Sequence, residues 1–153
     1  MHISTKLPKP TLITIGWREW AALPELNIRR IKFKTDTGAK TSSLHAINIE
    51  HFERDSQPWV RFDTQLKKHT AFKTLACEAR LIELRKVTNS GGETQNRPVI
   101  ETVIVLGSIS WKIQLTLADR TDMRFAMLLG RRAMQDHLLV DSARSHLLGK
   151  PIL

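Results

Sequence analysis

Cysteine is nearly absent from this chain of 153 residues, because Cys77 is the only one. A lone cysteine excludes an intrachain disulfide, and a chain of this length buries about 68–70 % of its unfolded surface without one. The sequence also lacks an apolar run of the ~18 residues that a membrane-spanning helix needs, and residues 1–6 contain no apolar run of the signal-peptide kind. We therefore expect one domain over residues 1–153, with residues 1–10 as a loose N-terminal arm, in a reducing, cytoplasmic setting.

Acidic side chains are in the minority. The chain has 15 Asp and Glu against 24 Lys and Arg, a formal charge of +9. A field of that sign attracts polyanions such as nucleic acid, anionic lipid or an acidic polypeptide, and it serves equally to keep a protein soluble. The basic residues are scattered, with no basic tail and no basic amphipathic helix. We therefore expect no membrane partner and no nucleic acid partner.

Helical periodicity is sparse, and alternation with a period of two residues dominates. The clearest half-buried strand covers residues 111–117, and Gly107-Ser108 joins it to the apolar run 99–106. A two-residue turn between two such runs predicts a β-hairpin. The chain is thus expected to be all-β or nearly so, a small closed or folded-over barrel. Further short strands are expected at residues 11–15, 60–62 and 82–84, and short helical turns at 18–23 and 130–137.

The candidate catalytic residue is Asp36, where the strand-like segment 31–36 runs into Thr37, Gly38 and Ala39. Aspartic peptidases place two carboxylates close enough to share one proton, so that one acts as an acid and the other as a base toward a water. Gly38 allows the backbone to fold back and aim its N–H at the carboxylate, and the Thr37 hydroxyl can hold the turn. Because Asp-x-Gly also marks ordinary turns after strands, the tripeptide alone leaves both interpretations open.

Two later segments complete a pattern that resembles the retropepsins. Residues 88–96 predict a hairpin loop with Gly91-Gly92 at its tip, and the apolar residues 127–129 lead into Gly130-Arg131. Retropepsins show the same order: Asp-Thr-Gly-Ala, a flap hairpin with a glycine tip, then two apolar residues and Gly-Arg at the start of a helix. The resemblance implies a closed β-barrel with a flap-like hairpin, one or two short helices, and a homodimer in which each subunit supplies one aspartate.

Longer segments resemble one bacterial and archaeal family that is often labelled "ATP-dependent zinc protease". That family is associated with ATP-grasp glutamate ligases of the type that modifies ribosomal protein. The resemblance implies Asp36 as the catalytic aspartate and a peptide or a glutamate-extended protein tail as substrate. The resembling segments are residues 16–20, 23–26, 36–46, 97–99 and 128–131. The candidate substrate-binding residues lie in or beside the three retropepsin-like elements and are Ala39, Lys40, Gly91, Gly92, Arg97 and Arg131, with Lys34 as a further cation.

The sequence differs from retropepsins at one position, and it lacks the zinc-binding and nucleotide-binding motifs that the family label suggests. Retropepsins commonly carry an acidic residue after Asp-Thr-Gly-Ala that pairs with the arginine of Gly-Arg, and here Lys40 stands in its place. The six histidines include no His-Glu-x-x-His and no pair at zinc-ligand spacing, so no metal is expected. A P-loop is also missing, so no nucleotide cofactor is expected.

Several candidates have plainer interpretations. Asp141 follows an apolar run and precedes small residues, so it is a rival second carboxylate, but a turn aspartate is the plainer role. Ser42, Ser43 and His45 are expected to form hydrogen bonds at a strand edge, and Cys77 is expected in the core. The rival function is a catalytically silent module that uses a basic groove to bind ribosomal protein or RNA.

Overall fold

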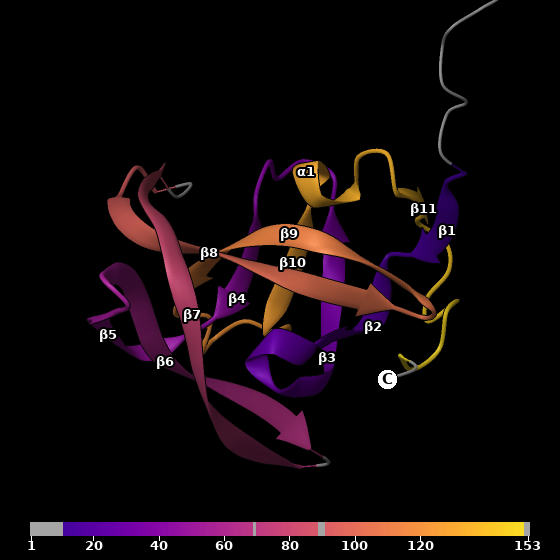
Figure 1. Ribbon diagram of the computed structural model, residues 1–153. Helices are drawn as coiled ribbons and strands as arrows, with labels where there is room; N and C mark the ends of the chain where they lie inside the picture. Colours follow the sequence, from indigo (N-terminus) through magenta and orange to yellow (C-terminus); the bar gives the residue numbers. More distant parts are fainter. Residues whose placement is uncertain (1–10, 69, 89–90, 152–153) are drawn as a thin grey trace, which may run out of the picture.

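The computed structural model describes residues 11–68, 70–88 and 91–151, so the predicted N-terminal arm at 1–10 lies outside the described residues. Nearly all regular structure is β, as expected (Figure 1). In the described part of the chain, no helix has the length and apolar character needed to cross a membrane. The strands are β1 (Ile13–Gly16), β2 (Arg18–Leu23), β3 (Ile28–Asp36), β4 (Ser42–His45), β5 (Ile47–Arg54), β6 (Gln57–Lys68), β7 (Ala71–Thr88), β8 (Thr94–Leu106), β9 (Ile109–Ala118), β10 (Met127–Gly130) and β11 (Leu138–Asp141), and the helical turns are η1 (Pro24–Leu26) and α1 (Arg131–Met134).

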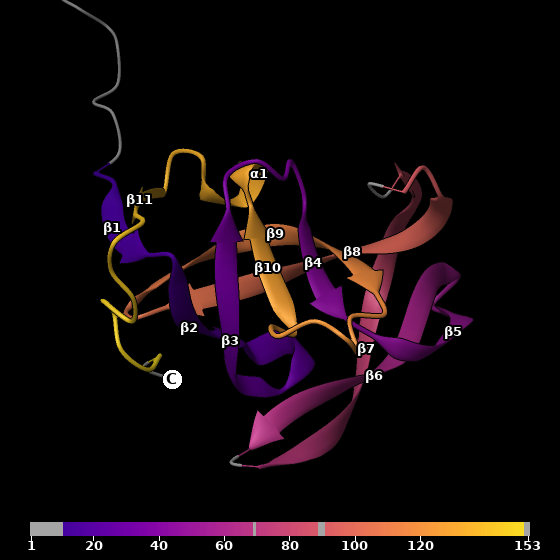
Figure 2. The same ribbon diagram turned by 180° about the vertical axis from the view of Figure 1, so that it is seen from behind.

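Six strands close into a barrel in the order β2-β3-β10-β4-β9-β8, and Ala22 of β2 pairs with Val105 of β8 to complete the ring. Closure leaves these strands without unpaired sheet edges. The sheet then continues from β8 through β7 and β6 to β5, which form a wing beside the barrel (Figures 1 and 2). The closed barrel predicted from the sequence is confirmed.

The barrel is filled by side chains that alternate along each strand. In β3, Ile31 and Phe33 are buried, while Arg30 before them and Lys32 between them are exposed. Burying one such apolar side chain contributes about 1.5–3 kcal/mol, so this alternation determines which face of β3 turns inward. Cys77 of β7 is 2 % exposed and joins the same core, as predicted.

Two hairpins predicted from turn residues are confirmed. Strands β8 and β9 meet around Gly107-Ser108, with Leu106 paired to Ile109, and Gly107 has a φ of +55° that favours glycine. Strands β7 and β8 form the flap-like hairpin, with Thr88 paired to Thr94. Local turn chemistry was enough to locate both.

The helical turn predicted over residues 18–23 is wrong, because that segment is strand β2. It pairs with β3 on one side and meets β8 on the other, and these ladder contacts override local propensity. The helical turn begins only at Pro24, whose fixed φ suits the first position of η1. The helix predicted over 130–137 is shorter, covering Arg131–Met134.

A buried carboxylate ties the end of the chain to the barrel. Glu19 of β2 is fully buried, and its oxygens accept the backbone N–H groups of Gly16 at 2.8 Å, Leu147 at 2.8 Å and Leu148 at 3.1 Å. A buried carboxylate is tolerated when hydrogen bonds replace its water. Glu19 therefore holds residues 147–148 against β2.

Candidate active site

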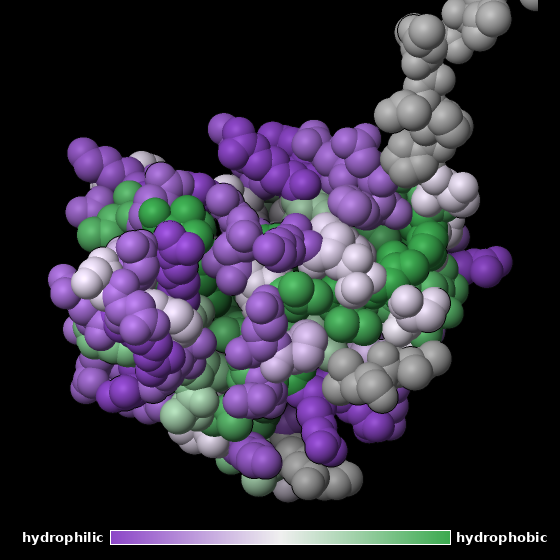
Figure 3. Space-filling view, in the orientation of Figure 1, coloured by the Kyte–Doolittle hydropathy of each residue, from purple (hydrophilic) through white to green (hydrophobic). Residues whose placement is uncertain are grey.

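Asp36 is the last residue of β3 and lies opposite Gly130, the last residue of the parallel strand β10. The chain then turns through residues 37–41 and enters β4. Figure 1 shows this loop beside α1 at one end of the barrel, and Figure 3 shows hydrophilic side chains gathered over that end. A half-buried carboxylate is therefore presented at a polar end of the molecule.

The loop itself orients the carboxylate of Asp36. Its Oδ1 accepts the backbone N–H groups of Gly38 at 2.9 Å and Ala39 at 3.1 Å. A Cβ at Gly38 would lie 3.2 Å from the same oxygen, so glycine allows the close approach. Among the described residues, no donor reaches Oδ2. One oxygen is thus fixed by the turn, and the other is available to a ligand or a water.

Strand β10 and α1 hold the loop from behind. The N–H of Arg131 donates to the carbonyl of Ala39 at 2.7 Å, and the N–H of Gly130 donates to Ser42 Oγ at 2.9 Å. A Cβ on Gly130 would lie 2.5 Å from the carbonyl oxygen of Thr41, so only glycine fits there without movement. The backbone of the Gly-Arg segment therefore supports the Asp36 loop by packing against it.

Arg131 has a partner other than the acidic residue that retropepsins use. Its Nη1 donates to the carbonyl oxygen of Thr37 at 3.1 Å, one residue after Asp36. The side chains of Thr37 and Lys40 are exposed, and Lys40 accepts the N–H of Arg132 at 3.2 Å through its carbonyl. The structure thus brings Asp36, Thr37, Gly38, Ala39, Lys40 and Arg131 together in one loop and its support.

The remaining predicted residues lie on the flap-like hairpin. Gly91 and Gly92 are exposed and lie between the paired residues Thr88 and Thr94. The tip of this hairpin lies at the same end of the molecule as α1 and the loop between β3 and β4 (Figures 1 and 2). Arg97 lies further along β8, opposite Arg85, and its charge adds to burial in lowering the pKa of Arg120. Within the described residues of this chain, no recorded contact joins Arg97 to Asp36.

Asp141 occupies a different setting from Asp36. It ends β11, which pairs only with β1 among the described strands. Its Oδ1 accepts the N–H of Ala143 at 3.0 Å, and its Oδ2 lies 3.5 Å from Nε of Arg144. Those are the bonds of a turn aspartate.

Sequence reasoning missed Arg120, which anchors the loop before β10. Its Nε donates to the carbonyl of Phe125 at 3.0 Å, its Nη1 to Ser43 Oγ at 3.1 Å, and its backbone N–H to His45 Nδ1 at 2.8 Å. These bonds agree with the strand-edge role expected for Ser43 and His45. An isolated arginine between two turn-like residues carries no sequence signal of this role. No cluster of three or more His, Cys, Asp or Glu side chains suited to a metal occurs among the described residues.

Comparison with known proteins shows which family the chain resembles. Residues 14–151 match the family model described as RimB-like, retropepsin-like aspartic endopeptidase RimB. Proteins named probable alpha-L-glutamate ligase, from Shewanella pealeana and Shewanella halifaxensis, are 43 % identical over 136 residues, which cover 89 % of this chain and 30 % of each relative. The chain thus spans less than a third of the length of these relatives.

A solved structure agrees with the family match. The crystal structure of a Legionella pneumophila protein of unknown function superposes with a TM-score of 0.71 and 32 % identity, over 88 % of this chain and 97 % of that one. The chain belongs to the RimB-like family of retropepsin-like aspartic endopeptidases.

Proposed function

We propose that this member of the RimB-like family is an aspartic endopeptidase, in which Asp36 from each of two subunits activates a water for peptide-bond hydrolysis. The observation that carries the proposal is the setting of the Asp36 carboxylate. Its Oδ1 is held by two backbone N–H groups of its own loop, and no described donor engages its Oδ2. A carboxylate fixed in this way is prepared to accept a proton from a water without losing its orientation.

The second carboxylate comes from a second copy of the chain. The only other aspartate that the sequence singled out, Asp141, is engaged by its own turn. A two-fold axis beside the Asp36 loop would bring two identical carboxylates together, and like-charge repulsion would leave one proton between them. The ionised carboxylate takes a proton from the attacking water, and the protonated one donates to the carbonyl oxygen. As the C–N bond of the resulting diol breaks, the carboxyl that took the proton from the water gives it to the departing amine nitrogen. The other carboxylate takes a proton from a hydroxyl of the diol, which restores the starting pair.

We further propose an acidic, glutamate-extended protein tail as the substrate. Relatives that are 43 % identical over 136 residues carry the name probable alpha-L-glutamate ligase, which supports a link between this fold and chains that contain added glutamate. Lys40 and Arg131 beside Asp36, and a formal charge of +9, favour an acidic chain. The proposed enzyme works in the cytoplasm without a metal or nucleotide cofactor.

Replacing Asp36 tests the catalytic proposal. We expect Asp36→Asn to abolish hydrolysis of a glutamate-extended peptide while leaving the thermal melt close to that of the parent chain. Asp141→Asn is the matched control, since it removes the same charge from a turn aspartate, and it should retain activity. Retained hydrolysis in Asp36→Asn would refute the proposal. A parent chain that binds the tail without cutting it would favour the catalytically silent module.

The dimer and the substrate have separate tests. Sedimentation velocity in the micromolar range should show a dimer, and an active monomer throughout that range would rule out the shared pair of aspartates. Peptides of equal length with Gln in place of Glu should be cut more slowly at low salt. Equal cleavage of both series would remove the electrostatic argument.

A further inference from the structure

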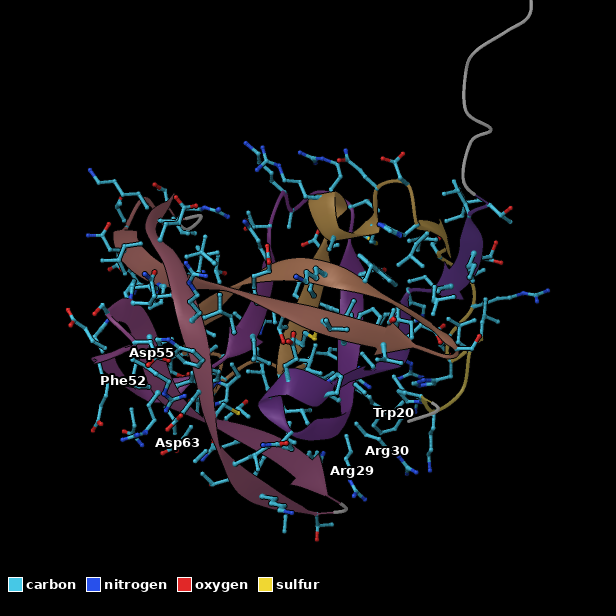
Figure 4. All side chains as sticks on the ribbon, viewed as in Figure 1. Trp20, Arg29, Arg30, Phe52, Asp55 and Asp63 are labelled. Carbon is cyan, nitrogen blue, oxygen red and sulfur yellow. The ribbon has the colours of Figure 1, made fainter. Side chains whose placement is uncertain are left out.

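A second concave surface lies away from Asp36, between the outer faces of β2 and β3 and the β6–β7 hairpin. It consists of two hollows of about 350 and 660 Å³ that share Trp20, Arg30, Leu66 and Lys67 in their linings. We call this surface the basic groove. Figure 4 shows Trp20, Arg29 and Arg30 close together at the lower end of the barrel.

Unpaired positive charge is the main property of the basic groove. Its walls carry Arg18, Arg29, Arg30 and Lys32 from β2 and β3, and Lys67 and Lys73 from the hairpin. No acidic residue is among the described residues that line it, and none of these cations forms a recorded ion pair in the described part of the chain. Elsewhere on the sheet, by contrast, Arg54 and Arg61 are both paired with Glu78.

The charges of these cations affect the pKa of a neighbouring histidine. His146 packs against Trp20, with ring centroids 6.1 Å apart. Burial lowers the pKa of His146, the charges of Lys32 and Arg18 lower it further, and the buried carboxylate of Glu19 opposes them. Cations that have no carboxylate partner attract an anion more strongly than cations already neutralised by carboxylates.

Apolar side chains are interleaved with the charges. Trp20, Leu66 and Leu75 line the groove between the cations, and Lys32 Nζ lies 5.0 Å from the centroid of the Trp20 ring. A ligand that fills this surface must combine negative charge with flat or apolar groups. Nucleotides carry phosphates and flat, exposed base faces, whereas an oligoglutamate carries carboxylates on short aliphatic side chains and has no flat aromatic face.

The basic groove and Asp36 lie toward opposite ends of β3. Lys32 precedes Asp36 by four residues and Arg29 precedes it by seven, which corresponds to about 13–23 Å at the rise of an extended strand. The scattered positions of the cations in the sequence gave no reason to expect a nucleic acid partner. Folding gathers cations from β2 and β3 together with Lys67 and Lys73 onto one surface.

We propose that the basic groove binds single-stranded nucleic acid, with phosphates on the cations and a base against Trp20. The site is independent of peptide hydrolysis and of the proposed function of Asp36. A single strand fits better than a duplex, because its bases are free to reach Trp20 and Leu66 while its backbone follows the two charged walls.

Fluorescence anisotropy with a labelled 12-nucleotide RNA tests the proposal. The parent chain should bind the single strand at least tenfold more tightly than a 12-base-pair duplex. Arg30→Glu/Lys67→Glu should weaken binding by about tenfold or more. Each lost phosphate contact should reduce the slope of log K against log salt by about 0.7, so this pair should reduce it by about 1.4. The matched control is Lys86→Glu/Lys112→Glu, which makes the same charge change at exposed residues of β7 and β9 and should change affinity less than threefold.

Several outcomes would overturn the proposal. Equal loss of affinity in the groove pair and the control pair would mean that only the overall charge attracts RNA. Equal affinity for the duplex would remove the role of the bases. Tighter binding of poly-L-glutamate, or of vesicles with anionic headgroups, would assign the groove to another ligand. If thermal melts show that the first groove pair is unfolded, Arg29→Gln/Lys73→Gln at two exposed positions answers the same question.

Discussion

Replacing Gly130 with alanine tests whether backbone packing holds Asp36 in its working position. A Cβ at residue 130 would lie 2.5 Å from the carbonyl oxygen and 2.6 Å from the carbonyl carbon of Thr41, and 3.0 Å from the carbonyl oxygen of Ala39. All of these are backbone atoms, so no flexible side chain can swing aside. The loop that supplies the N–H donors to Asp36 must therefore move away from β10.

The expected magnitude follows from overpacking. Forcing an extra methyl group into a filled site costs about 1–3 kcal/mol, and the lower entropy of the unfolded chain with alanine returns about 0.4–1 kcal/mol. A net loss of about 1–2 kcal/mol corresponds to a fall in Tm of roughly 2–8 °C for a domain of this size. Because a displacement of about 1 Å can cost about 10²-fold in rate, we expect kcat/KM to fall by that order well below the Tm.

Gly107→Ala is the control for this experiment. Residue 107 has a φ of +55°, so alanine there is destabilised by about 1–2 kcal/mol of backbone strain, in the β8–β9 turn far from β10 in the fold. The two variants should melt at similar temperatures, but only Gly130→Ala should lose kcat/KM at 25 °C. If Gly130→Ala kept both the Tm and the activity of the parent chain, the packing of the loop against β10 would not position Asp36.

Three further predictions concern other parts of the chain. Glu19→Gln replaces one acceptor oxygen with an NH2 group, which then faces the N–H of Leu148 in one amide orientation or the N–H groups of Gly16 and Leu147 in the other. Urea unfolding should therefore show a loss of about 1–3 kcal/mol, and unchanged stability would contradict the role of Glu19 in holding residues 147–148. Burial, with a smaller effect of Asp63, raises the pKa of the Cys77 thiol from 9.0 to about 11, so iodoacetamide should label the native chain at pH 8 at least about 10²-fold more slowly than the unfolded chain. Between pH 9 and 11 the unfolded thiol ionises first, so stability should fall with rising pH over that window. An Asp36 pair that shares one proton predicts that the rate of hydrolysis falls on both sides of an optimum pH. EDTA should not change this rate, and a loss of activity with EDTA that zinc reverses would contradict the mechanism.

Sequence reasoning succeeded where the structure depends on residues close together in the chain. The turn after β3 follows from Asp36, Gly38 and Ala39 alone, because Oδ1 accepts two N–H groups within three residues. The β8–β9 hairpin likewise follows from Gly107-Ser108 and the apolar runs on either side. Such features need no knowledge of the rest of the fold.

It failed where a distant segment decides the local conformation. Residues 18–23 become a strand because β3 and β8 supply partners, and Glu19 is buried because residues 147–148 supply N–H groups. Lys40 stands where retropepsins carry the acidic partner of Arg131, and Arg131 instead donates to the carbonyl of Thr37. Every residue carries a backbone carbonyl, so residue types do not show which carbonyl a side chain will bond. The sequence therefore could not predict this hydrogen bond.

The positive charge illustrates why a basic composition is weak evidence of where a polyanion binds. Lys34, Lys40, Arg97 and Arg131 lie in or near the motifs. Arg97 lies on β8 opposite Arg85, where its charge helps burial to lower the pKa of Arg120. Cations outside every motif come together in the basic groove, because the β6–β7 hairpin turns back toward the outer face of β2 and β3. That approach depends on the register of long strands, and each pair contributes little energy by itself. The local concentration of positive charge is thus determined by the fold, whereas the sequence shows only the net charge of the chain.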